Sequence, residues 1–288
     1  MNALQRSASD KDWPAQSLGR SLSAHRLIEE GLPVRLIATP RVDFKTCDID
    51  EAIGDVVARN HDKFDNFPVT EGSEKKRILG LIDVTAFRNG EAPSGHVHEK
   101  VTRLTESTLI GADASIIAFM RDPGPHGCRL VVSGSEISGL VSLSDLQKLP
   151  VRAALFGMVT HLEMVMADTI RRTYVKKEDW LGQLSANRQD KIRSEIKKSW
   201  KNDGFVDDLL FAQFADKISI IKKSKGFSES KKCFEDEMKR IQSLRNLVAH
   251  ANDYASTPKA ALDVCDIVRS TEKWIYWLDS WQRPAEAK

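Results

Sequence analysis

The chain has 288 residues, 41% of them apolar and 29% charged, so it is long enough for two domains with substantial hydrophobic cores. The net charge of +2 is unevenly divided, because residues 151–288 carry +5 and residues 1–150 carry −3. A net charge this small excludes an assignment as a polyanion-binding protein from charge alone. The basic C-terminal half is nevertheless compatible with a polyanionic partner.

The cysteines and the apolar runs restrict the cellular setting. No CxxC pair occurs and no histidine stands at metal-ligand spacing from a cysteine, so neither a zinc site nor a disulfide framework is indicated. Free thiols are typical of a reducing compartment. No apolar run approaches the roughly 18 residues that a membrane span requires, and residues 1–13 lack the apolar core of a secretion signal. We therefore expect a cytoplasmic protein that does not interact with a membrane.

The first 150 residues divide into a lead-in and a repeat. Residues 1–33 are polar and serine-rich, which predicts a partly disordered segment with a short helix near residues 18–30. A mixed helix and strand pattern then occurs twice, with a period of roughly sixty residues. Asp48 or Asp50 is the expected N-cap of the first helix. The predicted pieces are helix 48–64, strands 66–71 and 77–84, helix 112–122, strand 128–134, and a strand with a short helix over 136–149.

From Pro150 onward, glycine becomes sparse and helix formers dominate. Residues 151–172 place apolar side chains at the 3.6-residue spacing of an amphipathic helix. Further helices are predicted at 185–200, 206–223, 229–251 and 258–281. The expected fold class is therefore an α+β N-terminal part followed by an all-α bundle of about five helices. We expect the divisions to be a lead-in at 1–33, a repeat pair at 34–150 and a helical domain at 151–288.

One motif in the second copy carries a family resemblance. The segment GLVSLSD, from Gly139 to Asp145, resembles the ligand motif of CBS domains, which usually occur as tandem pairs. The resemblance implies that Asp145 binds the ribose hydroxyls of an adenine nucleotide and that Ser142 lies near its phosphates. A carboxylate accepts two hydroxyl donors well, and a hydroxyl beside a helix N-terminus suits a phosphate. Ser142 and Asp145 are also typical helix-capping residues, so both interpretations stand.

The first copy departs from this pattern. In GLIDVTA, from Gly80 to Ala86, Asp83 stands at the Ser/Thr position and Ala86 at the Asp position. A carboxylate repels a phosphate, and alanine cannot hold a ribose. We therefore expect at most one adenine-nucleotide site, in the second copy.

The segment GHVHEK between the copies suggests a metal site at first sight. His96, His98 and Glu99 lie close together in the sequence. No third or fourth ligand stands at a suitable spacing, so we expect a solvated linker and no metal site.

The segment SLRNLVAHANDY, from Ser243 to Tyr254, combines polar groups with an apolar helical pattern. Ile241, Leu244, Val248 and Ala251 are expected to form its buried stripe. Basic groups near a helix C-terminus are favoured by the helix dipole, so an ordinary helix end is one interpretation.

The other interpretation comes from a second resemblance. Asn246 and His250 lie one turn apart on a helix, and Arg245 and His250 lie about 140° apart around it. An arginine, a polar residue, three residues and a histidine resemble the motif of HEPN domains, small helical units of which many are ribonucleases. The resemblance implies that Arg245, Asn246 and His250 are catalytic and that Glu163 orients one of them. Glu163 is otherwise interpreted as an exposed helix residue.

The chemistry of these groups suits RNA cleavage without a metal or other catalytic cofactor. A base must remove the 2′-hydroxyl proton, an acid must protonate the leaving 5′-oxygen, and the transition state needs positive charge. Histidine suits the proton transfers, and arginine suits the phosphate oxygens. Because one motif supplies only half of these groups, and HEPN nucleases resemble two-fold dimers, we expect a homodimer through the helical domain.

The sequence thus predicts an endoribonuclease gated by an adenine nucleotide, which acts as a regulatory ligand of the CBS pair. The basic runs 191–198, 220–225 and 230–232 could guide RNA, although such runs are usually solvated helix faces. The resemblance is compatible with a stress-response, toxin-like or phage-defence role, in which a neutralising partner protein is a further candidate partner. The alternative is a non-catalytic regulatory or dimerisation protein that binds a nucleotide through the CBS pair and RNA or a partner through the helical domain.

Overall fold

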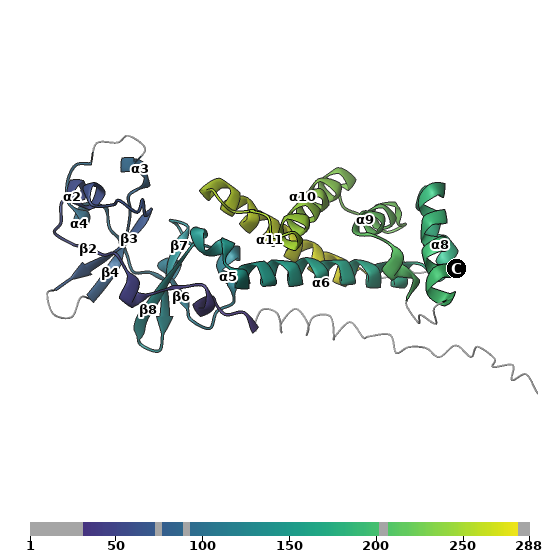
Figure 1. Ribbon diagram of the computed structural model, residues 1–288, viewed down its shortest axis with the longest axis horizontal. Helices are drawn as coiled ribbons and strands as arrows, with labels where there is room; N and C mark the ends of the chain where they lie inside the picture. The colour runs from purple at the N-terminus through teal and green to yellow at the C-terminus, as the bar shows by residue number, and fades with distance from the viewer. Residues whose placement is uncertain (1–30, 73–76, 89–92, 202–206, 282–288) are drawn as a thin grey trace, which may run out of the picture.

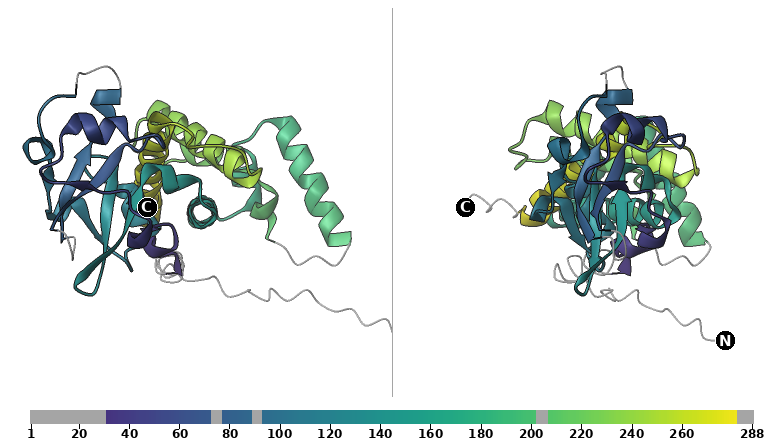
Figure 2. Two further views of the ribbon diagram at one scale, coloured as in Figure 1. Left: turned by 60° about the vertical axis from the view of Figure 1, so that its left-hand side comes forward. Right: turned by 90° about the vertical axis from the view of Figure 1, so that its left-hand side faces the viewer.

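The computed structural model describes residues 31–72, 77–88, 93–201 and 207–281, so residues 1–30 of the lead-in expected at 1–33 lie outside the described residues. The molecule is elongated, with two small sheets at one end and the helices at the other (Figure 1). The long helix α6, Leu149–Thr173, runs along the helical part and begins beside the second sheet. The left view of Figure 2 shows the same separation of sheets and helices from another direction.

The two sheets have one topology, which confirms the predicted repeat. The first has the order β2-β3-β4-β5 and the second the order β6-β7-β8 with β1 at the far edge. In each sheet a parallel strand precedes an antiparallel hairpin, and the fourth strand comes from outside that copy. The bounds are β1 Thr39–Pro40, β2 Cys47–Asp48, β3 Asn66–Glu71, β4 Arg77–Asp83, β5 Thr102–Arg103, β6 Leu109–Gly111, β7 Cys128–Ser133 and β8 Glu136–Ser142.

Equivalent glycines explain how the fourth strand of each sheet approaches. Gly80 in β4 pairs with Arg103 of β5, and a Cβ at Gly80 would lie 2.1 Å from the carbonyl oxygen of Thr102. Gly139 in β8 pairs with Pro40 of β1, and its Cβ would lie 2.9 Å from the carbonyl oxygen of Thr39. Both positions therefore exclude a side chain, which is one reason for glycine in a strand interior.

The helices of the repeat are shorter than expected. α2 covers Ile53–Ala58 and α5 covers Ile116–Arg121. The expectation that Asp48 or Asp50 caps the first helix is wrong, because Asp48 pairs in β2 and the N-cap is Ala52, which makes no side-chain cap. The remaining short pieces are α3 Thr85–Arg88, α4 Val97–Lys100 and the 3₁₀ turns η1 Val34–Leu36, η2 Arg41–Asp43, η3 Glu106–Thr108 and η4 Leu143–Gln147.

The C-terminal half is helical, as predicted. The stretch 206–223 is not one helix, because its described part forms the turn η5 and then α9. A short helix, α7, was not predicted. The bounds are α7 Lys177–Leu181, α8 Ala186–Lys201, η5 Asp208–Phe211, α9 Phe214–Lys223, α10 Lys231–Ala249 and α11 Pro258–Ser280.

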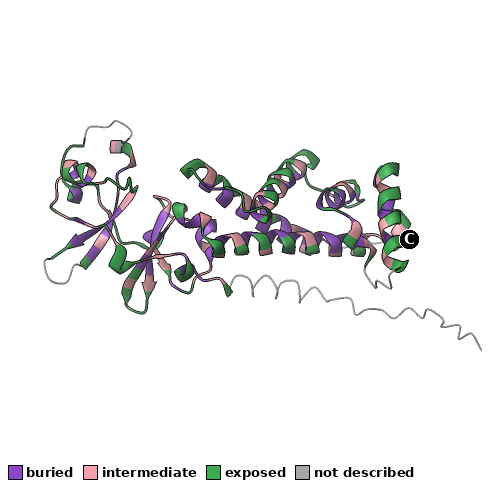
Figure 3. Cartoon of the chain, in the orientation of Figure 1, coloured by how far each residue is buried: buried purple, intermediate pink, exposed green. Residues whose placement is uncertain are grey.

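Helix α6 is the central helix of this half. It packs against α9, α10 and α11, and its buried and exposed residues alternate along its length (Figure 3). Contrary to the sequence-based expectation, it is long and apolar enough to cross a membrane by length and composition. Because 61% of its most apolar stretch is buried inside the protein, it is typical of a core helix.

The hydrophobic core does not stop at residue 150, where the helical domain was expected to begin. One core contains Phe119 of α5, Leu146 of η4, Leu155 of α6 and Trp274 of α11. The first sheet and α2 have a separate core, and a small apolar cluster lies between the two sheets. The second copy of the repeat therefore shares its interior with the helical bundle.

Candidate functional site

The end of α10 carries the residues Arg245, Asn246 and His250. The helix begins at the N-cap Ser230, whose hydroxyl accepts from the amide of Cys233 at 3.3 Å. It remains regular to Ala249, with His250 as its C-cap. The separation of about 140° between Arg245 and His250 is therefore retained.

The chain reverses immediately after His250. Ala251 has a φ of +54°, and the amide of Asn252 donates to the carbonyl oxygen of Leu247 at 2.9 Å. The amide of Ala251 donates to the carbonyl oxygen of Val248 at 3.4 Å. These two bonds form a Schellman motif. The prediction that Ala251 belongs to the buried stripe is wrong, because the helix ends before it and the residue is exposed.

The three motif side chains differ in exposure. Asn246 and His250 are exposed, whereas Arg245 is half-buried. Ile241, Leu244 and Val248 are buried on the other side of the helix, as predicted. The polar groups are thus accessible to a ligand, and the apolar stripe anchors the helix.

Glu163 of α6 lies between two cations. Its Oε2 atom is 3.8 Å from Nη2 of Arg245, and its Oε1 atom is 2.9 Å from Nζ of Lys217. Lys217 is 3% exposed and also donates to the carbonyl oxygen of Ala212 at 2.6 Å. The structure therefore places Glu163 beside Arg245 as a half-buried ion-pair partner. Within the described part of the chain, no ion pair or hydrogen bond joins Glu163 to His250.

Arg152, at the start of α6, contacts the same end of α10. Its Nη1 atom donates to the carbonyl oxygens of Leu247 at 3.2 Å and Val248 at 3.0 Å, and Nη2 donates to that of Asn252 at 3.0 Å. Its guanidinium also lies 4.9 Å from the ring centroid of Tyr254. A cation at this position adds charged donors to the last carbonyls of the helix and complements its dipole.

The second candidate site, Ser142 and Asp145, lies at η4. The Asp145 carboxylate accepts from the amide of Ser142 at 2.7 Å and from its hydroxyl at 3.2 Å. Its other oxygen lies 2.7 Å from Nζ of Lys148, which also donates to the carbonyl oxygen of Ile37. The structure therefore brings Ser142 and Asp145 together in a capping box, with Asp145 buried. A ribose bound at Asp145 would have to displace Lys148 or share the Asp145 carboxylate with it.

The two candidate sites are linked by short connections. The hydroxyl of Tyr254 donates to the carbonyl oxygen of Leu146 in η4, and the side-chain amide of Gln147 donates to the carboxylate of Asp253. Both partners from the helical half lie in the loop that follows His250. The turn carrying Asp145 is therefore in direct contact with the loop that follows α10.

The corresponding position in the first copy forms a different polar cluster. Asp83 accepts from the amide and the hydroxyl of Thr85, and its second oxygen lies 3.5 Å from Nδ1 of His126. Nε2 of His126 lies 2.8 Å from the hydroxyl of Thr102. Asp83 thus faces a group from the second copy.

The histidine pair between the copies lies at the start of the short helix α4, with His96 as its N-cap. The rings of His96 and His98 stack 5.7 Å apart, and both rings lie 4.0 Å from Glu99 as exposed pairs. Among the described residues, no group of three or more potential metal ligands was found.

Sequence reasoning missed Arg152, Lys148 and Lys217. Arg152 and Lys217 act through partners on other elements, so no spacing within one segment indicated them. Lys148 pairs with Asp145 only three residues earlier, which is a local signal. A second local signal was the position of Arg152 within the first turn of α6, where a cation is unfavourable unless another group accepts it.

The chain matches no family model and no curated protein. Solved structures similar to it include the CBS domain of a bacterial CNNM/CorC family Mg²⁺ transporter in complex with ATP, at 19% identity and a TM-score of 0.36, over 47% of this chain and 96% of that one. A hemolysin-like protein of Oenococcus oeni containing a CBS domain is similar at 16% identity and a TM-score of 0.34, over 43% of this chain and 93% of that one. The CBS domains of a transcriptional regulator from Streptococcus pneumoniae are similar at 18% identity and a TM-score of 0.30, over 40% and 96%. At these identities and scores the likeness assigns no activity to this chain.

Proposed function

We propose that the protein is a metal-independent endoribonuclease whose activity is regulated by an adenine nucleotide bound to an N-terminal CBS pair. The observation that carries the catalytic part is the end of α10, where exposed Asn246 and His250 stand within the last two turns together with Arg245, whose partner is Glu163. A cation beside a neutral amide and a titratable imidazole matches the needs of phosphodiester cleavage.

The proposed roles follow from the groups. His250 transfers a proton to or from the RNA, Arg245 stabilises charge on the phosphate oxygens, and Asn246 donates to phosphate or orients the imidazole. Glu163 positions Arg245 through the contact at 3.8 Å. One copy of the motif supplies one imidazole, so the acid and the base come from two copies in this proposal.

A dimer that joins two motifs is supported by the outer face of α6. Leu149, Phe156 and Met164 are exposed by 76%, 46% and 48%, and Ala153 and Thr160 lie between them on the same face. On an α-helix this apolar stripe lies directly beside the position of Glu163. An exposed apolar stripe of this length is typical of an interaction site. Pairing of two such stripes would bring both Glu163–Arg245 pairs to the edge of one interface.

Regulation by the CBS pair is supported by the contacts at η4. Ser142 and Asp145 are the proposed ligand residues, and Leu146 and Gln147 in the same turn bind the loop after His250. A nucleotide that exchanges the Asp145–Lys148 contact for a ribose contact would shift this turn. A ligand changes an equilibrium only through such differential contacts.

The catalytic proposal is tested with purified protein and a labelled RNA. The wild type is expected to cleave it in the presence of EDTA, whereas His250→Ala and Arg245→Ala are expected to lose at least a hundredfold in rate while melting normally. Lys259→Ala, which alters an exposed lysine on α11, is the matched control. In cells, arrest of growth by the wild type but not by His250→Ala is expected.

The regulatory proposal requires a separate titration. Cleavage is followed against adenine nucleotides for the wild type, for Asp145→Asn and for Gln147→Ala. Asp145→Asn is expected to weaken nucleotide binding, and Gln147→Ala is expected to retain binding but respond less. No dependence of the rate on any adenine nucleotide would remove this part of the proposal.

The second candidate is a non-catalytic regulatory or dimerisation protein. It is favoured by the ion pair between Arg245 and Glu163, because an arginine held by a carboxylate has a structural role without any chemistry. Under this alternative, wild type and His250→Ala leave RNA equally intact, and nucleotide binding changes only the association state.

A further inference from the structure

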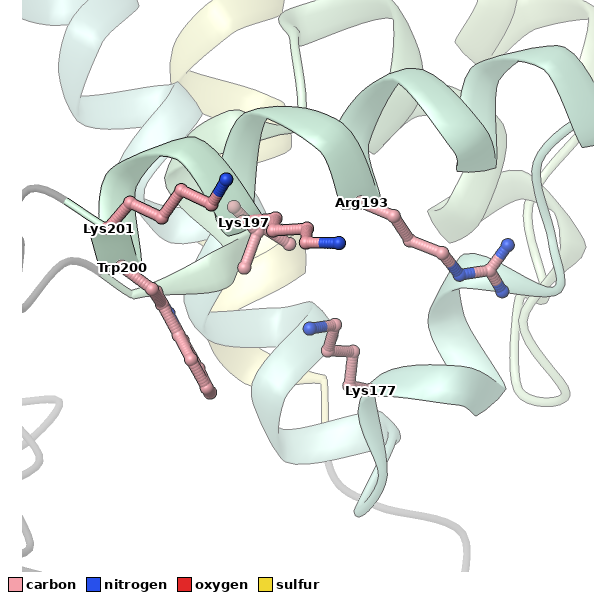
Figure 4. Close-up of a pocket in the computed structure, with 6 residues that line it drawn as sticks. Lys177, Arg193, Lys197, Trp200 and Lys201 are labelled. Carbon is pink, nitrogen blue, oxygen red and sulfur yellow. The ribbon is translucent and has the colours of Figure 1, made fainter.

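A basic groove with an exposed tryptophan lies at the end of α6 opposite Arg152. It has a volume of about 440 Å³ and is lined by residues of α7 and α8, namely Lys177, Arg193, Ile196, Lys197, Trp200 and Lys201 (Figure 4). We propose that this basic groove binds single-stranded RNA, with a base stacked on Trp200 and phosphates held by the lysines. The inference rests on the proposed function for its choice of RNA and adds a substrate-binding site remote from His250.

The exposure of Trp200 is the first supporting observation. Its side chain is 67% exposed, whereas Trp180, Trp274 and Trp281 are buried. An indole left in water forfeits the stabilisation that burial of its apolar surface would supply. A planar ring on the surface offers a stacking platform to any unpaired base, and every base has a face that can use it.

The arrangement of the cations is the second supporting observation. Arg193, Lys197 and Lys201 recur every four residues and form one ridge of α8, about 6 Å apart along the axis. This is comparable with the separation of consecutive phosphates in an extended strand. Trp200 stands beside the end of the ridge, and the amino groups of Lys177 and Lys197 point into the same space (Figure 4).

The neutralisation of these charges is incomplete. Lys177 pairs with Asp208 at 2.9 Å, and Arg193 lies 3.5 Å from Asp190. For Lys197 and Lys201, no carboxylate within the described ranges lies at ion-pair distance. Two exposed lysines flanking an aromatic ring therefore have their charge available to a ligand. Phosphate contacts of this kind provide affinity without reading the sequence.

The combination favours a single strand. A duplex keeps its bases stacked on one another, so it could use the lysines but not the indole. An acidic polypeptide could likewise use the lysines, but it gains little from a stacking platform. Dependence on both the ring and the charges distinguishes single-stranded nucleic acid from either of these.

The length of α6 separates this groove from the proposed catalytic residues at the end of α10. Arg152 contacts the end of α10 near the start of α6, and Lys177 follows its last residue, Thr173. At 1.5 Å per residue the two ends are about 30 Å apart. A change in the groove is therefore expected to alter RNA binding and KM without altering the rate of the chemical step.

The test measures binding of a fluorescently labelled 2′-O-methyl dodecamer, which cannot be cleaved through its 2′-oxygen, to the full-length protein. Trp200→Ala is expected to weaken binding roughly tenfold, and Trp200→Phe to restore most of it. Tyr276→Ala, which removes another exposed aromatic residue on α11, is the matched control and should bind as the wild type. Far-UV circular dichroism and thermal melting verify that the variants are folded.

Salt dependence separates the two kinds of contact. Lys197→Ala and Lys201→Ala are each expected to reduce the slope of log Kd against log salt by about 0.7, whereas Trp200→Ala leaves the slope unchanged. Equal binding by the wild type and the groove variants would overturn the proposal. So would displacement by polyglutamate as effective as displacement by unlabelled oligonucleotide, which would assign the groove to an acidic polypeptide.

The outcome is distinguishable from that of the proposed function. His250→Ala is expected to bind the dodecamer normally and to fail only in cleavage of ordinary RNA. If neither wild type nor His250→Ala cleaves RNA but Trp200→Ala still loses binding, the groove stands as an RNA-binding site and the ribonuclease proposal fails.

Discussion

The guanidinium of Arg152 lies 3.0 Å from the carbonyl oxygen of Val248, so the first turn of α6 is bonded directly to the last turn of α10. Arg152 follows η4 by only a few residues, and its side chain also contacts the Tyr254 ring. The proposed nucleotide site is therefore linked to the proposed catalytic motif through Arg152 and the loop that carries Tyr254.

Replacement of Arg152 by alanine is expected to lower the free energy of unfolding by about 2 kcal/mol, because several carbonyl oxygens lose charged donors. This corresponds to a fall in Tm of roughly 4–8 °C. Differential scanning calorimetry measures it, with Arg35→Ala as the control, since Arg35 pairs with Asp113 at an exposed site. An unchanged Tm for Arg152→Ala would show that the contacts are energetically silent.

Removal of the Glu163 carboxylate is expected to destabilise the helical bundle. Glu163→Gln leaves the buried ammonium of Lys217 without its charged partner and should lower the free energy of unfolding by about 3 kcal/mol. The double variant Glu163→Gln, Lys217→Met should recover most of this loss, because no unpaired charge then remains buried and Arg245 is partly exposed. Urea denaturation of the two single variants and the double variant gives the coupling energy. Additive losses would contradict a coupled pair.

The turn after His250 is expected to gain stability from glycine. Ala251 has a φ of +54°, which costs a residue with a Cβ about 1 kcal/mol relative to glycine. Ala251→Gly is therefore expected to raise the free energy of unfolding by about 1 kcal/mol. Ala249→Gly, two residues earlier in the helix, is expected to lower it by a similar amount. Both are measured by chemical denaturation, and a loss of stability in Ala251→Gly would be inconsistent with this turn geometry.

The buried thiols are expected to make stability depend on alkaline pH. Burial raises the pKa of Cys47 and of Cys128 to about 12 and that of Cys265 to about 11. An unfolded thiol ionises near pH 8.5, so between pH 8.5 and these values the unfolded chain releases protons that the folded chain keeps. The contribution of the buried thiols to the free energy of unfolding is therefore fully present below about pH 8.5. It falls as the pH rises, and the loss is about 1.4 kcal/mol per thiol at pH 9.5.

Two measurements examine this expectation. Urea denaturation at pH 7.5 and pH 9.5 should show a smaller pH effect in Cys128→Ala than in the wild type. A thiol reagent at pH 8 should label exposed Cys233 quickly and the three buried cysteines only after unfolding. Rapid labelling of all four in the native protein would contradict the burial.

The sequence predicted the elements better than the contacts between them. The alternating strands and the roughly sixty-residue period identified the repeat, because strand periodicity and glycine position are local properties. Helix ends were predicted less accurately. Asp48 or Asp50 was expected to cap α2, but Asp48 pairs with β3 and the cap is Ala52, because a ladder formed between distant segments overrides a local capping preference.

The candidate site shows the same division. The spacing of Arg245, Asn246 and His250 is fixed by the sequence of one helix, and so is the capping arrangement of Ser142 and Asp145. Their roles in catalysis and nucleotide binding remain predictions. The sequence alone therefore determined which side chains share a turn of helix.

Only the tertiary structure decided which of these groups meet. It placed Glu163 between Arg245 and Lys217, joined the loop after His250 to η4, and set Lys177 against the ridge of α8. These contacts join residues that lie 16 to over 100 positions apart in the chain. Such pairs depend on the packing of whole helices around a shared core, and no periodicity within a single segment encodes that packing.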